Sequence, residues 1–235
     1  MVQKNGAKKG ATDTSSKGEI EQMEAMTTAV IVRHGECPGN REGLFRGRKD
    51  FPLNENGVKQ AQALATAISK RWGISAVYSS PLSRAMETAR IVAERCNAPF
   101  YSDESFNNIN LGPWEGRPKA DVEKEFPKEW QTWLLSPEDL RLPGAESLGD
   151  VQRRAFEGLE ALIRRHRGEP FVVVSHRAVI KPLIAACLKI LPPYFWRTHV
   201  DTASYSVLVH NGARGYCLTQ LNETDHLESF IQEWV

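Results

Sequence analysis

Short apolar runs rich in β-branched residues alternate with longer segments of helical periodicity, and this alternation limits the folds open to the chain. Clear runs lie at 29–32, 76–78 and 171–174, and a weaker one lies at 99–101. Strands buried on both faces have continuous apolar sequences of this kind. The alternation predicts a single three-layer α/β domain with a mainly parallel sheet, right-handed crossovers and helices on both faces.

The expected helices begin at recognisable capping residues. Residues 58–72 carry one apolar face. A second helix is predicted from Ser80 as its N-cap, with Pro81 at the first helical position. A third should begin at Ser147, where Asp150 three residues later completes a short capping box.

The chain is predicted to form one domain over residues 28–235 after a flexible tail over 1–27. The tail is rich in Lys, Thr, Ser, Gly and Glu, which cannot build a core. Residues 105–146 contain three tryptophans and several prolines, and we expect them to form an excursion over the site at the sheet edge. Late strands at 204–210 and 216–221 are expected to pair as a hairpin.

Composition argues against several classes of function. The formal net charge is only +1, without a basic stripe, so nucleic acid is not an expected partner. No apolar run approaches the roughly 20 residues of a membrane span, so no membrane association is expected. Four dispersed cysteines predict reduced thiols in a cytoplasmic protein. The six histidines lack metal-ligand spacing, so we expect neither a metal nor another cofactor. The oligomeric state is open, with a homodimer as one expectation.

Arginine and histidine side chains gather just beyond the ends of the predicted strands. Arg33 and His34 follow the first strand, Arg84 lies early in the second helix, and His176 follows the run at 171–174. Ligands of parallel sheets bind beyond these strand ends, where helix N-termini also favour anions. Paired arginines recognise phosphate, and an adjacent imidazole can attack phosphorus. Taken singly, a His after a strand is more often a capping or core residue, and an Arg in a first helical turn is usually a solvated charge. Their joint placement at successive strand ends predicts a phosphoryl-transfer site.

These residues belong to a series of motifs that resembles the histidine phosphatase superfamily, which is phosphoglycerate mutase-like. In chain order the motifs are Val32-Arg33-His34-Gly35-Glu36 with Asn40 and Gly47, Ser79 to Ala85, Gly112 to Gly116, Pro143-Gly144 with Glu146-Ser147, and Val174-Ser175-His176. The resemblance implies hydrolysis of a small phosphorylated metabolite, of sugar phosphate or phosphoglycerate type, through a phosphohistidine at His34. It implies that Arg33, Arg84 and His176 form the phosphate pocket. Asn40, Gly47 and Glu36 are expected near the substrate.

The proton donor of the leaving group departs from the family pattern. In the family a Glu lies a few residues before the Gly-x-Trp-Glu-Gly segment, and the corresponding residue here is Asn108. An amide is not a proton donor at neutral pH, and general-acid help is worth about 10²–10⁴ in rate. Glu36, Glu104 and Glu115 are alternative donors. Otherwise the leaving group needs no proton, or the protein is weakly active or only binds phospholigands.

A second departure is Arg177, where many members of the family have Gly. Ser-His-Arg at this place resembles the phosphatase branch more than the mutases. The side chain of Arg177 is expected either to extend the anion site or to point into solvent. A mutase stays an alternative, although the moderate stretch between Gly116 and Pro143 favours hydrolysis.

Overall fold

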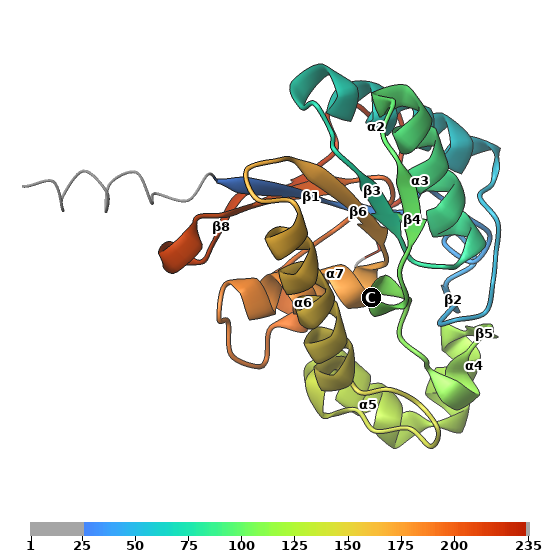
Figure 1. Cartoon of the computed structure of the whole chain (residues 1–235). Coiled ribbons are helices and arrows are strands. Elements are labelled where there is room, and N and C mark those ends of the chain that lie inside the picture. The colour runs from blue at the N-terminus through green and yellow to red at the C-terminus, as the bar shows by residue number, and fades with distance from the viewer. Residues whose placement is uncertain (1–25, 234–235) are drawn as a thin grey trace, which may run out of the picture.

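A six-stranded sheet forms the centre of the computed structural model, which describes residues 26–233 (Figure 1). The strand order is β4-β3-β6-β1-β7-β8, in which the first four strands are mutually parallel and β7 is antiparallel to both of its neighbours, β1 and β8. The strands are β1 (Thr27–Arg33), β3 (Val77–Ser79), β4 (Phe100–Ser102), β6 (Phe171–Ser175), β7 (Tyr205–His210) and β8 (Tyr216–Glu223). The prediction of a mainly parallel sheet is confirmed.

Helices cover both faces of this sheet, as the alternating sequence predicts. The long helices are α2 (Glu55–Arg71), α3 (Ser83–Cys96), α6 (Leu148–Arg165) and α7 (Arg177–Cys187). Val30 packs with α2 and α3, whereas its neighbour Ile31 packs with α6 and α7, because successive side chains of a strand point to opposite faces. Figure 1 shows these two helical layers on either side of the sheet. The three-layer architecture is therefore confirmed.

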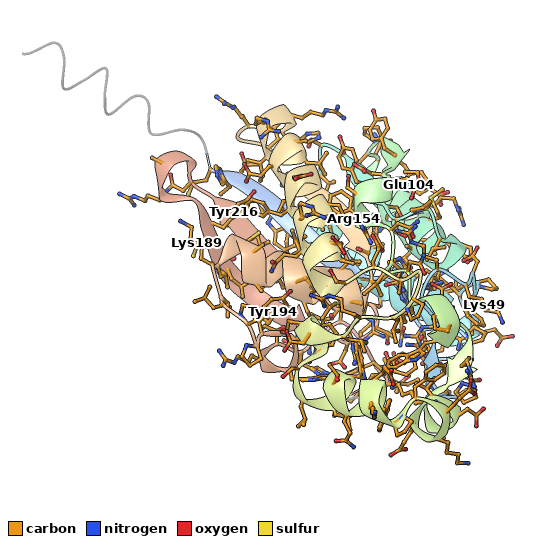
Figure 2. The ribbon with its side chains drawn as sticks, turned by 90° about the horizontal axis from the view of Figure 1, so that it is seen from below. Lys49, Glu104, Arg154, Lys189, Tyr194 and Tyr216 are labelled. Atoms are coloured by element: carbon orange, nitrogen blue, oxygen red, sulfur yellow. The ribbon has the colours of Figure 1, made fainter. Side chains whose placement is uncertain are left out.

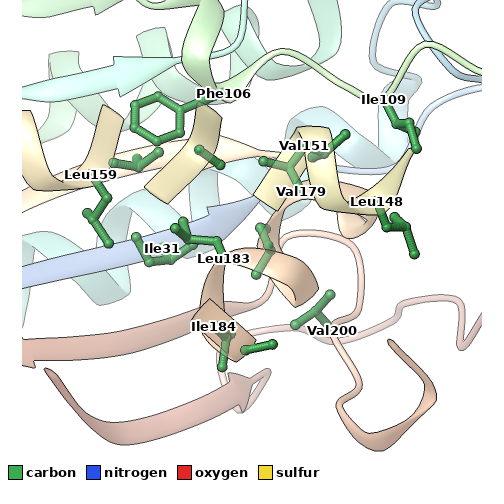
Figure 3. Close-up of a cluster of buried hydrophobic side chains, with 14 of the residues drawn as sticks. Ile31, Phe106, Ile109, Leu148, Val151, Leu159, Val179, Leu183, Ile184 and Val200 are labelled. Carbon is green, nitrogen blue, oxygen red and sulfur yellow. The ribbon is translucent and has the colours of Figure 1, made fainter. Parts of the chain in front are cut away.

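The layer of α6 and α7 is fixed by a buried apolar cluster (Figure 3). Ile31 of the sheet, Leu159 of α6 and Leu183 of α7 are all almost completely buried. Burial of one such side chain contributes about 1.5–3 kcal/mol. Phe106 joins the same cluster and fixes the start of the excursion to the core. The residue immediately before α7, His176, is thus presented from a rigid support.

The predicted excursion is a small cap beside the carboxyl edge of the sheet. Its elements are α4 (Lys119–Glu125), α5 (Pro127–Leu135) and β5 (Arg117–Pro118), which pairs with β2 (Leu44–Phe45). The ring centroids of Phe45 and Trp114 lie 4.8 Å apart, and those of Phe45 and Trp133 lie 5.4 Å apart. Aromatic packing therefore ties the cap to the segment that follows β1.

Of two helix starts predicted from the sequence, one is observed and the other is not. The capping box of Ser147 and Asp150 is present at the start of α6, as predicted. Helix α3 instead begins at Ser83, three residues after the predicted N-cap. The N-cap is Leu82, so that prediction is wrong, and the hydroxyl of Ser80 instead lies 2.7 Å from Nε2 of His176, outside the helix.

Near both ends of the described chain, the observed elements differ slightly from the predicted ones. Strand β1 begins at Thr27, the last residue of the predicted tail, and residues 1–25 lie outside the described part. Strands β7 and β8 pair as predicted, but their connection contains the short 3₁₀ helix Gly212–Arg214. Across residues 26–233, no helix has both the length and the apolar character that a bilayer crossing requires.

Candidate active site

Parallel strand pairing brings the predicted histidines and arginines together at the carboxyl edge of the sheet. Arg33 of β1 pairs with Ser175 of β6, so the residues that follow these two positions emerge side by side. The ring centroids of His34 and His176 are 5.0 Å apart. These two imidazoles, Arg33 and Arg84 are each at most 2% exposed.

His34 is held with one ring nitrogen free for chemistry. Its Nδ1 lies 2.7 Å from the carbonyl oxygen of Gly35. A carbonyl only accepts hydrogen bonds, so Nδ1 carries the proton and Nε2 carries a lone pair. Burial, with the nearby charges of Arg84 and Arg33, holds the pKa of His34 well below its usual range. The ring is therefore neutral at pH 7 and keeps the lone pair on Nε2.

His176 provides a second neutral imidazole. Its Nε2 lies 2.7 Å from Oγ of Ser80, which itself accepts from the N–H of Leu82. When the Ser80 hydroxyl donates to Nε2, the proton of the ring resides on Nδ1. That buried Nδ1 has no hydrogen-bond partner among the described residues. Burial and the charge of Arg84 hold the pKa of His176 well below its usual range, so His176 can donate to an anion without being charged.

Arg84 is a buried cation that is held mainly by carbonyl groups. Its Nη2 donates to Gly47 at 3.0 Å and its Nη1 to Lys49 at 3.2 Å. The half-exposed carboxylate of Asp50 is 3.7 Å away. Burial lowers the pKa of Arg84 to about 10. The half-exposed carboxylate of Asp50 compensates this buried charge only in part, so the guanidinium favours an incoming anion.

Gly47 and Asn108 are brought to the same pocket as His34. Gly47 has a φ of +51°, and a Cβ there would lie 2.4 Å from Oε1 of Glu115, so this position needs glycine. Its carbonyl also accepts from Nδ2 of Asn108 at 2.7 Å, and Oδ1 of Asn108 accepts from the N–H of Ile109 at 3.0 Å. The Asn108 amide therefore fastens two loops together.

Glu233, which the sequence analysis missed, lies against the predicted phosphate pocket. Its carboxylate forms an ion pair with Arg33, accepts from Nδ2 of Asn40 at 2.9 Å and lies 3.4 Å from Nη2 of Arg46. Its backbone oxygen accepts from Arg177 at 2.7 Å. Although burial alone raises it, the pKa of Glu233 is held well below its usual range by Arg33, Arg46 and Arg177.

Both cationic and apolar side chains line the pocket that contains His34. Arg46, Lys119 and Arg177 contribute positive charge, whereas Trp133 and Phe195 contribute apolar walls, and the complete lining also includes Leu44, Phe45, Gly47, Asn108, Ile109, Leu111, His176, Ala178 and Glu233. Arg177 thus follows the first of its two predicted alternatives and extends the charged site. Arg46 and Lys119 lie outside the motifs, and no local signal in the sequence distinguishes them.

Glu36 does not take the predicted position near the substrate. Its buried carboxylate accepts from Nε of Arg41 at 2.8 Å and from the side-chain amides of Asn54 and Asn56 at 2.8 and 2.9 Å. It is not among the residues that line the pocket. A Cβ on Gly57 would lie 2.0 Å from the carbonyl oxygen of Glu36, so the backbones of the two segments are in close contact. Glu36 therefore braces the start of α2.

The other two alternative proton donors also lie outside the pocket lining. Glu104 is exposed on the surface (Figure 2). Oε1 of Glu115 accepts from the backbone N–H groups of Arg48 and Leu111 at 2.8 and 3.0 Å. Among residues 26–233, the one carboxylate in the pocket lining is that of Glu233, and its lowered pKa makes it a poor acid.

We expect the free energy of unfolding to fall as the pH decreases below about 6.5. The pKa values of His34 and His176 are well below 6.5 in the folded protein, so in this range the unfolded chain binds protons that the folded protein does not. Each proton that only the unfolded chain binds lowers the free energy of unfolding by about 1.4 kcal/mol for each pH unit of decrease. Denaturant unfolding between about pH 7 and about pH 5 measures the slope. A double variant, His34→Asn with His176→Asn, should reduce the slope without abolishing it, because burial also lowers the pKa values of His166 and His226. An unchanged slope would contradict the assignment.

Fold and site together define a class: an α/β protein with a histidine–arginine anion site at the carboxyl edge of its sheet. Residues 29–223 match the family described as histidine phosphatase superfamily (branch 1). The chain belongs to this superfamily, which confirms the resemblance found in its motifs. Within residues 26–233, no group of three or more His, Cys, Asp or Glu side chains is arranged to hold a metal ion.

The similarity between this chain and individual relatives extends over nearly the full length of each relative. Phosphoserine phosphatase 1 of Hydrogenobacter thermophilus is 34% identical over 208 residues, which cover 88% of this chain and 98% of the relative. The solved structure of YhfR from Bacillus stearothermophilus aligns with a TM-score of 0.81 and 30% identity, covering 86% of this chain and all of that one. A mycobacterial glucosyl-3-phosphoglycerate phosphatase in complex with VO3 aligns with a TM-score of 0.76 and 28% identity, covering 84% and 99%.

Proposed function

We propose that this protein hydrolyses phosphomonoesters of small metabolites through a phosphohistidine at His34. The observation that carries the proposal is the neutral ring of His34, with its Nε2 lone pair, buried beside His176 and two arginines. Two relatives that bear the names of phosphatases of small metabolites support the same activity. The protein is then a phosphoric monoester hydrolase.

The proposed reaction has two displacements at phosphorus. In the first, Nε2 of His34 attacks in line, a P–N bond forms, and the P–O bond to the leaving group breaks. Arg33, Arg84 and His176 stabilise the charge on the equatorial oxygens. In the second, water attacks phosphorus, the P–N bond breaks, and inorganic phosphate leaves.

We infer that the substrate carries a second negative group beside its phosphoryl group. Arg46, Lys119 and Arg177 line the pocket beyond His34. Burial and the charge of Arg177 lower the pKa of Lys119 to about 8, which leaves it mostly protonated at pH 7. Phosphoserine and phosphoglycerates have a carboxylate that suits these cations, and the names of the two phosphatase relatives point to this group of substrates.

A direct assay tests the function. The full chain is incubated with phosphoserine, with 3-phosphoglycerate and with a sugar monophosphate that has no carboxylate, and both inorganic phosphate and isomerised product are measured. We expect phosphate release, fastest with the carboxylated substrates, without isomerisation. Isomerised phosphoglycerate would establish the mutase alternative. Binding of phosphoserine without either product would establish a phospholigand-binding protein.

The role of position 108 gives a separate prediction. Asn108→Glu should increase hydrolysis of alkyl phosphates at least about tenfold, because it places an acid where the leaving oxygen needs a proton. Hydrolysis of p-nitrophenyl phosphate should change little, since that leaving group departs without a proton. The ratio of the two rates is the measurement.

Asn108→Gln is the matched control, because Gln has the length of Glu but cannot donate a proton in the same way. Both variants disturb the bond from Nδ2 of Asn108 to Gly47, so the comparison isolates the acid. Equal alkyl-to-aryl ratios in the two variants would show that position 108 does not face the leaving group.

We also infer a cytoplasmic location from the four cysteines, all of which are free in the structure. A homodimer, and the lack of nucleic-acid and membrane partners, stay predictions from the sequence.

A further inference from the structure

The carboxylate of Glu233 occupies hydrogen-bond donors that a phosphoryl group needs. One oxygen, Oε2, binds Nη2 of Arg33 and accepts from Nδ2 of Asn40 at 2.9 Å, and the other lies 3.4 Å from Nη2 of Arg46. Nη1 of Arg33 already donates to the carbonyl oxygen of Val200 at 2.8 Å. Both terminal nitrogens of Arg33 therefore already have partners, one of them the carboxylate of Glu233, and among the described residues only its Nε is buried without one.

The rest of the phosphate pocket is not filled in this way. Among the described residues, Nδ1 of His176 and the Nε atoms of Arg84 and Arg33 are buried without a hydrogen-bond partner. The pocket therefore keeps unpartnered donors for an anion, while the carboxylate of Glu233 already neutralises part of its positive charge. Glu233 is 8% exposed, so its carboxylate is seated inside the site.

Glu233 belongs to residues 224–233, which follow β8 and contain no helix or strand. This segment is held earlier along its length by a bond of 3.0 Å between Nε2 of His226 and the carbonyl oxygen of Ala203. A second bond of 3.0 Å joins Nε2 of Gln60 to the carbonyl oxygen of Ser229. The segment can therefore keep both attachments while the residues beyond Ser229 swing away from the pocket.

We propose that Glu233 is an internal competitor for the phosphoryl group of the substrate, and that residues 230–233 withdraw when the substrate binds. This inference rests on the proposed function, because it assigns Arg33 and Asn40 to the phosphoryl group. A dianionic phosphoryl group competes for the Arg33 guanidinium better than a monoanionic carboxylate does. Weakly charged ligands fail to displace Glu233, so the competitor selects for strongly anionic substrates.

Binding of inorganic phosphate measures the competition without any need for turnover. Glu233→Gln keeps the shape of the side chain but removes its charge. We expect this variant to bind phosphate about tenfold more tightly in calorimetry, because phosphate no longer competes with a carboxylate for Arg33. The matched control is Glu228→Gln, an exposed position of the same segment, which should bind as the unaltered chain does. Equal or weaker phosphate binding by Glu233→Gln would overturn the proposal.

Hydrogen exchange of the unaltered chain gives a second measurement, independent of any variant. Saturating phosphate or vanadate should increase amide exchange in residues 230–233 and leave α2 unchanged, whereas increased protection of 230–233 would overturn the proposal. The assays also separate this inference from the proposed function. Tighter phosphate binding by Glu233→Gln without hydrolysis of any substrate would support the competitor and refute the phosphatase. Hydrolysis with unchanged phosphate affinity would refute the competitor alone.

Discussion

Substitution of His34 by asparagine is expected to lower kcat/KM for phosphate release by about 10⁴-fold or more, because the covalent nucleophile is lost. Asparagine retains a polar side chain of similar bulk but has no nitrogen lone pair able to form a stable P–N bond. The unaltered chain, quenched during turnover of a labelled phosphomonoester, should carry an acid-labile and base-stable phosphoryl label. The variant should carry none.

The control for this experiment is His210→Asn. His210 lies in β7 and pairs with Thr27, at the opposite end of β1 from Arg33, so its replacement should leave labelling and turnover unchanged. A His34→Asn protein that releases phosphate at the rate of the unaltered chain, or that still takes up the label, would refute the phosphohistidine mechanism. Circular dichroism of both variants shows whether folding is retained.

The features that the sequence predicted correctly depend on local patterns. The run at 171–174 shows the apolar character of a buried strand, and Ser147 shows a capping box within four residues. The gathering of His34 and His176 needs only one further rule, that parallel strands end at the same edge of a sheet. These inferences succeed because short-range chemistry or simple topology determines the result.

The predictions that were wrong or missed a residue concern side chains whose positions depend on partners far away in the sequence. Ser80 has the local features of an N-cap, but its hydroxyl is bonded to His176, 96 residues away. Glu36 stands beside the histidine motif, yet the amides of Asn54 and Asn56 turn its carboxylate away from the pocket. No local pattern marks Glu233, which meets Arg33 across a separation of 200 residues.

Arg84→Lys should lower kcat/KM by about 10²–10³-fold, although the variant keeps a positive charge. Two nitrogens of the Arg84 guanidinium donate hydrogen bonds to the carbonyl oxygens of Gly47 and Lys49, which fixes the plane of the group. Its Nε has no partner among residues 26–233. An ammonium cannot reproduce this planar set of donors. The loss should fall mainly on kcat, because the fixed donors act where charge develops on the transferring oxygens.

Arg90→Lys is the matched control, because Arg90 lies in the same helix with its side chain 54% exposed, paired with Glu94 on the surface. Its kinetics should equal those of the unaltered chain. The same two variants also separate geometry from charge. If any cation sufficed at position 84, Arg84→Lys would retain full activity, and the buried carbonyl contacts of Arg84 would then be only structural. A loss confined to Arg84→Lys, accompanied by weaker binding of vanadate, would instead show that the planar guanidinium stabilises the transferring phosphoryl group in the transition state. The buried position of Arg84 would then contribute to catalysis, because it fixes the guanidinium in place.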